Sequence, residues 1–447
     1  MRARSAGAVL SRVAAARGAA TLSTATVTGT ARSHKVVVVG GGTAGASVSH
    51  QLLRGGQYAR GDVAVVDPAV WHHYQPGWTL VGGGLKDKDD LRLRMTDVLR
   101  DPRLTLYPQA VRGFSPAENA VTLASGDRLQ YEQLVVCPGI RVDYAAIKGL
   151  PEALADPDLP VSTVYGYDGV DKVFGTVERL RRGQALFTQP AGIIKCAGAP
   201  QKVMWLALDH WRRAGRYSAG DDAAAPEIRI AFATALPAMF GVPKYSAALE
   251  ALRRERGVEG LFQHDLVEVN GDRAVFARTG ETAATVTRRF DLLHAVPKMG
   301  PHAFVADSPL ADAAGLVAID PATLRHATHA NVWALGDAAG LPTAKTAAAV
   351  TAQAPVLVAN LLAAAEGKAP TAAYDGYTSC PLTTEYGKVL LAEFQYGGTP
   401  KETFAALGVD QAVPNRAFYH LKKDFFPWVY KNYMVKGAWG GPKGFLR

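Results

Sequence analysis

The chain has 447 residues, of which 48% are hydrophobic and 20% are charged, a balance that predicts two or three globular domains and excludes a largely disordered protein. Its formal net charge is +9, but five arginines fall within residues 1–34, so the remainder carries only +4. The other basic residues are scattered along the sequence, which argues against a nucleic-acid partner.

The first 34 residues differ from the rest in composition. They hold many Ser, Thr and Ala residues, no acidic residue, and five arginines: Arg2, Arg4, Arg12, Arg17 and Arg32. This pattern is typical of a mitochondrial transit peptide, with a flexible N-terminus as the alternative. Because matrix-facing proteins keep ordinary thiols reduced, we expect any disulfide among the three cysteines to be catalytic.

A dinucleotide-binding fingerprint follows this leader. Residues 34–39 predict a buried parallel strand, residues 40–45 read GGGTAG, and a helix is expected over about 46–53. Gly40 would allow the tight turn, Gly42 the approach of a pyrophosphate, and Gly45 the close packing of helix on strand. A second strand over 62–67 ends in Asp67, where a ribose hydroxyl needs an acceptor. The sequence therefore predicts a nucleotide site rather than an ordinary glycine-rich turn.

Short strands around residues 120–131, which turn at 125–127, predict a small β-meander. The next apolar strand ends at Cys137, which we interpret as a core residue.

A second Rossmann-like unit is predicted by strands at residues 184–188 and 228–232. Directly after the first of these, where a pyridine-nucleotide reductase would have its glycine fingerprint, residues 189–200 read QPAGIIKCAGAP. The phosphate loop is missing and Cys196 stands in its place. We therefore expect no NAD(P)H site here.

The surroundings of Cys196 favour a thiolate. Pro200 suits the first turn of a helix that continues to about residue 213, so Cys196 lies just before a positive helix end. Lys195 and Lys202 are expected to lower the pKa of the thiol further. An inert, buried cysteine near a turn is the alternative.

Residues 331–337 predict a short strand that delivers Asp337, and a long apolar helix opens at about residue 343. In flavoproteins with two dinucleotide-binding domains such an aspartate contacts FAD, and such a helix directs its positive end at the flavin. The sequence thus favours FAD over NAD. The alternative is a surface turn followed by a core helix.

Cys380 is followed by Pro381 and is expected in a loop. By itself this cysteine looks structural.

The C-terminal region mixes aromatic residues with lysines, a pattern typical of interfacial membrane segments. No run of 18 or more apolar residues occurs, which predicts a chain that lies on a bilayer without crossing it. Packing on the domain core, or a dimer interface, is the alternative. The residues concerned are Phe425, Phe426, Trp428, Val429, Tyr430, Tyr433, Met434 and Trp439, with Lys422, Lys423, Lys431 and Lys436.

No metal site is expected, because the histidines show no ligand spacing with cysteine or carboxylate. The histidines considered were His72, His73, His294, His302, His326 and His329.

Several segments together resemble the mitochondrial sulfide:quinone oxidoreductases. They are residues 195–202 (KCAGAPQK), 74–76 (YQP), 78–82 (WTLVG), 345–349 (KTAAA) and 374–382 (YDGYTSCPL), and the resemblance extends over about 35–441. The cysteine-bearing segments are specific to that family, whereas the glycine fingerprint is shared by many flavoproteins. Two departures are Asp67, where a Glu is commoner, and Cys137-Pro138-Gly139 in place of Ala-Thr-Gly.

The resemblance implies that Cys196 and Cys380 form the redox pair, closing a disulfide or a trisulfide that hydrogen sulfide opens. Two electrons would pass through FAD to ubiquinone, and the sulfane sulfur would leave as a persulfide for glutathione or sulfite. The enzyme would lie on the matrix side of the inner mitochondrial membrane as a monotopic protein. Phe394 and Tyr396 are the candidates for stacking near the quinone ring, or equally core aromatics. The residues that it implies in FAD binding are Thr43, Ala44, Asp67, Gln75, Val111, Asp337, Lys345, Thr346, Ala347 and Ala348.

The predicted fold class is α/β, with two Rossmann-like domains of the disulfide-reductase type. The FAD domain comprises residues 35–155 and 298–372, the second domain without an NAD(P) site 156–297, and the membrane-facing region 373–447. Two other functions stay open: a type II NADH:quinone reductase, which would need the missing second fingerprint, and a non-catalytic mitochondrial flavoprotein redox sensor.

Overall fold

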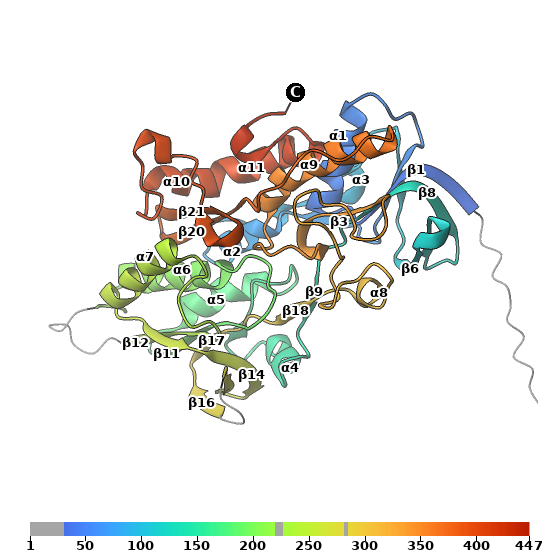
Figure 1. The fold of residues 1–447 in the computed structure, drawn as a ribbon. Coiled ribbons are helices and arrows are strands. Elements are labelled where there is room, and N and C mark those ends of the chain that lie inside the picture. The colour runs from blue at the N-terminus through green and yellow to red at the C-terminus, as the bar shows by residue number, and fades with distance from the viewer. Residues whose placement is uncertain (1–30, 220–226, 281–284, 447) are drawn as a thin grey trace, which may run out of the picture.

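The computed structural model describes residues 31–219, 227–280 and 285–446, and it shows two α/β bodies with a C-terminal layer (Figure 1). The first body contains the blue and orange elements, the second the green and yellow ones, and the C-terminal layer is red. Most of the predicted leader lies outside the described residues. Its last four residues overlap strand β1, which begins at Ala31.

The first body is built on a seven-stranded sheet in which β1 pairs in parallel with β2 and β8. The run Val36–Val39 is buried throughout, as expected for a central parallel strand. Helix α1 (Thr43–Arg54) follows β1 and packs beside α9 (Ala347–Ala365). The strands are β1 (Ala31–Val39), β2 (Val63–Val66), β5 (Leu104–Tyr107), β6 (Val111–Ser115), β7 (Ala120–Leu123), β8 (Arg128–Val136) and β19 (Val332–Ala334). The predicted meander corresponds to β6, β7 and β8.

The second body has a five-stranded parallel sheet of order β10-β17-β11-β12-β13 and a three-stranded antiparallel sheet. The five strands are β10 (Val161–Ser162), β17 (Leu292–His294), β11 (Gly183–Gln189), β12 (Ile228–Thr234) and β13 (Glu259–Phe262). The antiparallel strands are β14 (His264–Asn270), β15 (Arg273–Arg278) and β16 (Thr285–Arg289), and the helices are α4 (Leu150–Ala155), α5 (Val170–Arg179), α6 (Ala199–Arg213) and α7 (Pro243–Glu255).

The chain passes between the two bodies through a two-stranded link. Strands β9 (Arg141–Asp143) and β18 (Lys298–Gly300) pair antiparallel where the chain leaves the first body and returns to it. Helix α4, which the sequence analysis places in the FAD domain, contacts β10 and β14 of the second body.

The C-terminal layer covers both bodies: β20 packs on α6, and the last helical turns pack on α1. Its elements are β20 (Thr378–Glu385), β21 (Lys388–Gln395), β22 (Thr399–Pro400), α10 (Arg416–His420), the π-helical turn η7 (Leu421–Phe425), α11 (Phe426–Asn432) and η8 (Met434–Lys436). Short elements elsewhere are β3 (Trp71–His73), η1 (Gln75–Gly77), α2 (Trp78–Val81), β4 (Arg92–Arg94), α3 (Met95–Val98) and α8 (Ala303–Ala306).

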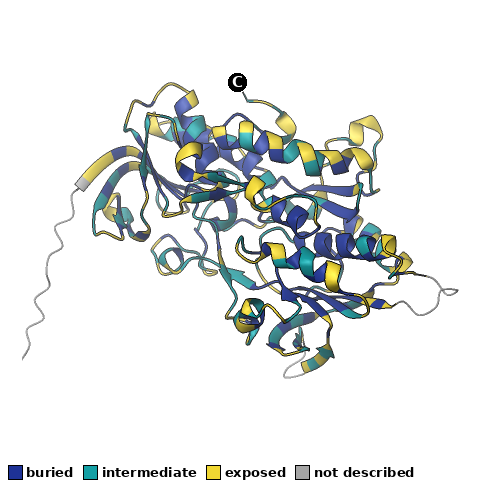
Figure 2. Ribbon diagram, turned by 180° about the vertical axis from the view of Figure 1, so that it is seen from behind, coloured by how far each residue is buried: buried dark blue, intermediate teal, exposed yellow. Residues whose placement is uncertain are grey.

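Buried residues follow the central strands and the inner faces of the helices (Figure 2). In the part of the chain that the structure describes, α9 alone is long and apolar enough to cross a membrane by length and composition. More than half of its apolar window is buried within the protein, a property that core helices share. The helix contains no uninterrupted run of 18 apolar residues, because Thr351, Gln353 and Asn360 lie within it.

Candidate active site

The glycine loop after β1 has the shape that a dinucleotide phosphate requires. Gly40 has φ +104°, and a Cβ on it would lie 2.5 Å from the Cys137 carbonyl oxygen. A Cβ on Gly45 would lie 1.7 Å from the Gly40 oxygen, so only glycine lets α1 approach the strand. Gly42, in contrast, is exposed and has open space where its Cβ would be. The loop therefore presents the N-terminus of α1 to a ligand.

Polar residues predicted to hold FAD surround this loop. Asp67 follows β2, and its Oδ2 accepts a hydrogen bond from the Gly41 amide at 2.6 Å, which leaves lone pairs for a ribose hydroxyl. Thr346 caps α9 by accepting from the Ala349 amide at 3.0 Å. Burial raises the pKa of Asp337, against the charges of Lys195 and Lys345. The exposed Gly42 backbone and the N-termini of α1 and α9 could donate hydrogen bonds, and the Asp67 carboxylate could accept them. Together these groups fit FAD.

The remaining predicted cofactor residues lie on or beside α1, α9 and β6 of the first body. Lys345 is buried, and its Nζ donates to the Ala339 carbonyl at 2.5 Å. The others are Ala44 at the start of α1, Val111 at the start of β6, and Ala347 and Ala348 in the first turn of α9.

The two cysteines predicted to be a pair lie next to each other, although they come from distant segments of the chain. Cys196 precedes α6 and Cys380 lies on β20, and their Sγ atoms are 3.3 Å apart although 184 residues separate them. The Cys196 amide donates to the Lys345 carbonyl at 2.8 Å, which joins the cysteine segment to the start of α9. Cys196 has φ +55°, a strained conformation for a residue with a Cβ.

Gly198 provides the space in which the sulfurs meet. A Cβ at this position would lie 2.4 Å from the Cys380 Sγ and 2.7 Å from Leu382 Cδ2. No local sequence pattern signals this requirement, because the contact comes from a strand far along the chain.

The two cysteines differ in the direction in which their surroundings shift the thiol pKa. The hydrogen bond from Cys380, together with the charges of Lys202 and Lys422, lowers the pKa of Cys196 well below its usual range, although burial opposes this. The same bond, together with burial, raises the pKa of Cys380 well above it. Lys202 donates to the Cys196 Sγ at 3.4 Å, and the sulfur charge raises the pKa of Lys202 although burial lowers it. In the reduced pair these pKa shifts favour the thiolate on Cys196 and the thiol on Cys380.

Lys195 does not point at this thiolate, and the expectation that it does is wrong. Its Nζ donates to the Gln75 Oε1 at 3.2 Å, and its ammonium faces Asp337. Lys195 and Cys196 thus contact different groups although they are neighbours in the sequence. Both Lys195 and Gln75 thus lie on the expected cofactor side.

Cys380 is in a strand, not in the expected loop. Pro381 lies within β20 and is opposite Leu391 of β21. A proline is tolerated there because β20 is the edge strand of its sheet. The pattern around Pro381 excludes a helix but does not distinguish a loop from an edge strand.

Lys422 and Tyr430 of the C-terminal layer also differ from expectation. Lys422 is 2% exposed, and its Nζ donates to the Pro76 carbonyl at 2.9 Å. Tyr430 is 1% exposed, and its hydroxyl lies 2.7 Å from the Thr43 Oγ1 and 2.6 Å from the His72 Nε2. Thr43, expected to contact FAD, is therefore also the contact point of the C-terminal helix on the phosphate loop.

A chain of aromatic rings covers the outside of this layer. Trp428 and Phe445 are about half exposed, and successive ring centroids lie 4.8 to 5.9 Å apart. We call these six residues the aromatic surface: Phe425, Phe426, Trp428, Tyr433, Trp439 and Phe445. Val429 and Met434, which the sequence analysis counts with this surface, are buried inside.

Phe394 and Tyr396, the candidate quinone residues, pack within the protein. The Phe394 ring is T-shaped against Phe240, and the Tyr396 ring is T-shaped against Tyr374. Tyr396 also lies directly over Gly376, where a Cβ would collide with its ring. This packing is what core aromatics show.

Cys137 takes no part in the pair. It is buried against the phosphate loop, and burial raises the pKa of its thiol strongly. His294 is fully buried, and its Nε2 accepts from the Val164 amide at 3.2 Å. Within residues 31–219, 227–280 and 285–446, no three His, Cys, Asp or Glu residues are grouped to hold a metal ion.

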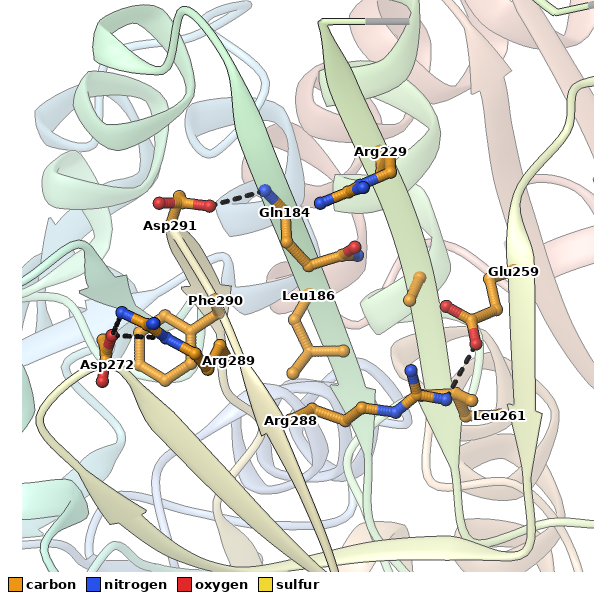
Figure 3. Close-up of a pocket in the computed structure, with 11 residues that line it drawn as sticks. Gln184, Leu186, Arg229, Glu259, Leu261, Asp272, Arg288, Arg289, Phe290 and Asp291 are labelled. Carbon is orange, nitrogen blue, oxygen red and sulfur yellow. Dashed lines mark hydrogen bonds and ion pairs between the residues drawn. The ribbon is translucent and has the colours of Figure 1, made fainter. Parts of the chain in front are cut away.

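An open cavity of about 430 Å³ lies in the second body, and it is not the candidate site (Figure 3). It lies at the amino ends of β11, β12 and β13, whereas nucleotides bind at the carboxyl ends of parallel strands. Two of its arginines are already paired, Arg288 with Glu259 and Arg289 with Asp272.

The two Rossmann-like bodies, the phosphate loop and the paired cysteines define an α/β oxidoreductase of the disulfide-reductase flavoprotein class. A family model for pyridine nucleotide-disulphide oxidoreductases matches residues 34–173.

Comparison with similar proteins identifies the family within this class. The mitochondrial sulfide:quinone oxidoreductase of Schizosaccharomyces pombe is 45% identical over 433 residues, which cover 92% of each chain. The protein of the same name from Dictyostelium discoideum is 42% identical and covers 91% of this chain and 87% of its own. The chain belongs to the mitochondrial sulfide:quinone oxidoreductase family. The X-ray structure of the Aquifex aeolicus sulfide:quinone oxidoreductase shares the fold, with a TM-score of 0.71 over 89% of this chain and 92% of that chain at 16% identity.

Proposed function

We propose that this chain oxidises hydrogen sulfide at the Cys196–Cys380 pair and passes two electrons through FAD to ubiquinone. The observation that carries the proposal is the 3.3 Å separation of two sulfurs that stand beside Lys202, at the place where the second body would otherwise have a phosphate loop. Family membership supports the same reaction.

The unequal pKa values of the two cysteines support a direction of attack. In thiol–disulfide exchange the sulfur of lower pKa leaves faster. Hydrosulfide would therefore attack the sulfur on Cys380, forming one S–S bond as the bond to Cys196 breaks. Cys196 leaves as a thiolate, which Lys202 stabilises, and Cys380 holds the persulfide.

The pair also has room for a bridge of either length. The 3.3 Å separation exceeds an S–S bond of about 2.05 Å and is close to the span of two such bonds through one inserted sulfur, roughly 3.3 Å. We propose a disulfide or trisulfide as the oxidised form. The persulfide sulfur then goes to a small thiol or anion such as glutathione or sulfite, and re-forming the bridge releases two electrons.

Bound FAD would accept those two electrons and deliver them to the quinone. Gly40, Gly42 and Gly45 would admit the pyrophosphate, Asp67 the ribose, and the N-terminus of α9 would face the flavin. Lys195 and Gln75, which contact each other, would both contact this cofactor.

The aromatic surface is our proposal for the membrane contact, on the matrix side of the inner mitochondrial membrane. The half-exposed rings of Trp428 and Phe445, in a segment that also carries Lys423, Lys431 and Lys436, suit the headgroup region of a bilayer with anionic lipids. Phe394 stays our proposal for a residue near the quinone, with Tyr396 beyond it, because β21 pairs with the strand of Cys380. Their packing supports a structural role equally well.

The test is to mix purified, detergent-solubilised protein anaerobically with sulfide, or with NADH in a parallel sample, and to record the flavin absorbance. We expect rapid bleaching by sulfide, reversal by a soluble ubiquinone, and no bleaching by NADH. Bleaching by NADH alone would replace this proposal with the type II NADH:quinone reductase. A flavin that neither reductant bleaches would leave the redox-sensor function.

A further inference from the structure

The peptide group between Lys195 and Cys196 is held from two sides. Its carbonyl oxygen accepts a hydrogen bond from the Tyr165 hydroxyl at 3.0 Å, and its amide donates to the Lys345 carbonyl at 2.8 Å. Tyr165 follows β10 of the second body, whereas Lys345 lies just before α9 of the first. The preceding amide, that of Lys195, donates to the Met299 Sδ at 3.3 Å. The orientation of this peptide group is therefore fixed by residues of both bodies.

This peptide group determines where the Cys196 side chain points. The φ angle of Cys196 is +55°, a conformation that residues with a Cβ rarely adopt. With this φ the Cys196 Sγ lies 3.3 Å from the Cys380 Sγ. Without an external hold the residue would relax to a negative φ, which would turn its side chain relative to the peptide group. The two hydrogen bonds therefore offset a local strain whose release would move the sulfurs apart.

Tyr165 is suited to act as this hold. It is 5% exposed, and its own carbonyl accepts a hydrogen bond from the Tyr144 hydroxyl. Burial, and after it the charges of Cys196 and Cys380, raises the pKa of the Tyr165 phenol well above its usual range. Because burial is the largest cause, the phenol stays protonated and donates whether the sulfur pair is open or closed.

We propose that Tyr165 is a positioning residue for the sulfur pair: its hydroxyl keeps the peptide group before Cys196 in the orientation that brings the two sulfurs together. The open pair then already has the strained conformation, so closing the bridge need not produce it. The same hold lets Lys195 contact Gln75 on the proposed cofactor side while Cys196 faces Cys380. The inference rests on the proposed function, because it concerns how the same bridge re-forms after each turnover.

The test measures the equilibrium of the bridge and needs no sulfide. The FAD-loaded enzyme is equilibrated anaerobically with mixtures of reduced and oxidised dithiothreitol, so that the cysteine pair is oxidised as the reagent's disulfide is reduced. Acid quenching, alkylation and peptide mass give the bridged fraction. Tyr165→Phe keeps the ring and loses the hydroxyl, so we expect the equilibrium constant for closing the bridge to fall about threefold to tenfold. An unchanged constant would overturn the proposal.

Tyr217→Phe is the matched control. Tyr217 is also buried in the second body, and its hydroxyl also donates to a backbone carbonyl, that of Arg256. We expect this change to lower thermal stability and to leave the equilibrium of the bridge at its wild-type value. An equal fall in both variants would show a general effect of lost stability, and the proposal would be wrong.

A second variant distinguishes the hydroxyl of Tyr165 from its ring. Incorporation of 3-fluorotyrosine in place of Tyr165 keeps both the ring and the donor, and it should restore the wild-type constant. A constant as low as that of Tyr165→Phe would attribute the loss to ring packing and contradict the proposal. Loss of FAD from Tyr165→Phe would do the same, because it would show that the hydroxyl supports the whole fold rather than the pair.

These measurements separate the inference from the proposed function. An enzyme that ignores sulfide but shows the shift in Tyr165→Phe would keep the inference and sink the proposed function. An enzyme that sulfide bleaches, but whose Tyr165→Phe variant has the wild-type constant, would keep the proposed function and sink the inference.

Discussion

The two large sheets of this protein differ in the connection that follows the carboxyl end of a parallel strand, β1 in the first body and β11 in the second. After β1 the chain turns through glycines and enters α1 within four residues, which leaves a backbone cradle. After β11 it runs through residues 190–198 before α6 begins, and this longer connection carries Cys196. A helix N-terminus follows in both cases. In one case the helix follows the glycine loop that we propose for the phosphates, and in the other it follows Cys196, so the two proposed sites differ in one connection.

The largest expected effect comes from removing the sulfurs. Cys196→Ser and Cys380→Ser should each reduce the rate of sulfide-dependent flavin bleaching at least about a thousandfold, because the pair acts as a unit. Both variants should retain FAD, since neither residue lies at the phosphate loop. Stopped-flow absorbance measures the rate, and Cys137→Ser is the control that should bleach normally.

Gly45→Ala should disrupt the glycine loop that connects β1 to α1. The new Cβ would lie 1.7 Å from the Gly40 oxygen, so α1 must move away from β1 and the phosphate cradle opens. We expect FAD content after purification to fall about tenfold or more. Gly113→Ala, whose Cβ meets nothing within 4 Å in the same body, should keep the flavin. Full occupancy in Gly45→Ala would contradict our assignment of the cradle.

Gly198→Ala should impair sulfide oxidation while FAD binding is retained. Its Cβ would lie 2.4 Å from the Cys380 Sγ, which pushes the sulfurs apart while the phosphate loop stays intact. We expect normal FAD content and a loss in bleaching rate of roughly tenfold to a hundredfold. Gly169→Ala is the matched control because that position is open and has an ordinary φ of −103°.

The smallest effect should come from Tyr430→Phe. This change removes the hydroxyl that joins α11 to Thr43 and His72, so the C-terminal layer holds the phosphate loop less firmly. A hydrogen bond of about 0.5–1.5 kcal/mol corresponds to a twofold to twelvefold faster release of FAD. Flavin fluorescence follows the release. Trp428→Phe, on the exposed face of the same helix, should release FAD at the wild-type rate.

The sequence predicts the two connections well because each is a local pattern. The run of valines, the glycines at 40–45 and Pro200 determine strand, turn and helix from neighbouring residues. Contacts between distant segments have no such local signal. Lys422 and Pro76 are 346 residues apart and Tyr430 and Thr43 are 387 apart, so aromatic and basic composition alone could not show which side chains turn inward.

The pairing of Cys196 with Cys380 came from family resemblance rather than from local pattern. Pro381 was informative only in excluding a helix, and the edge position of β20 depends on the whole C-terminal sheet. The orientation of the Lys195 side chain also depends on a distant residue, Gln75, so no local pattern predicts it.

The most direct test of the central claim is a peptide mass map of the oxidised enzyme, alkylated under denaturing conditions before and after anaerobic addition of sulfide. We predict one cross-linked peptide that joins Cys196 to Cys380 through two or three sulfurs, and its disappearance as the flavin bleaches. Both cysteines freely alkylated in the oxidised enzyme, or a cross-link that persists while sulfide bleaches the flavin, would contradict the claim that this pair is the site of sulfide oxidation.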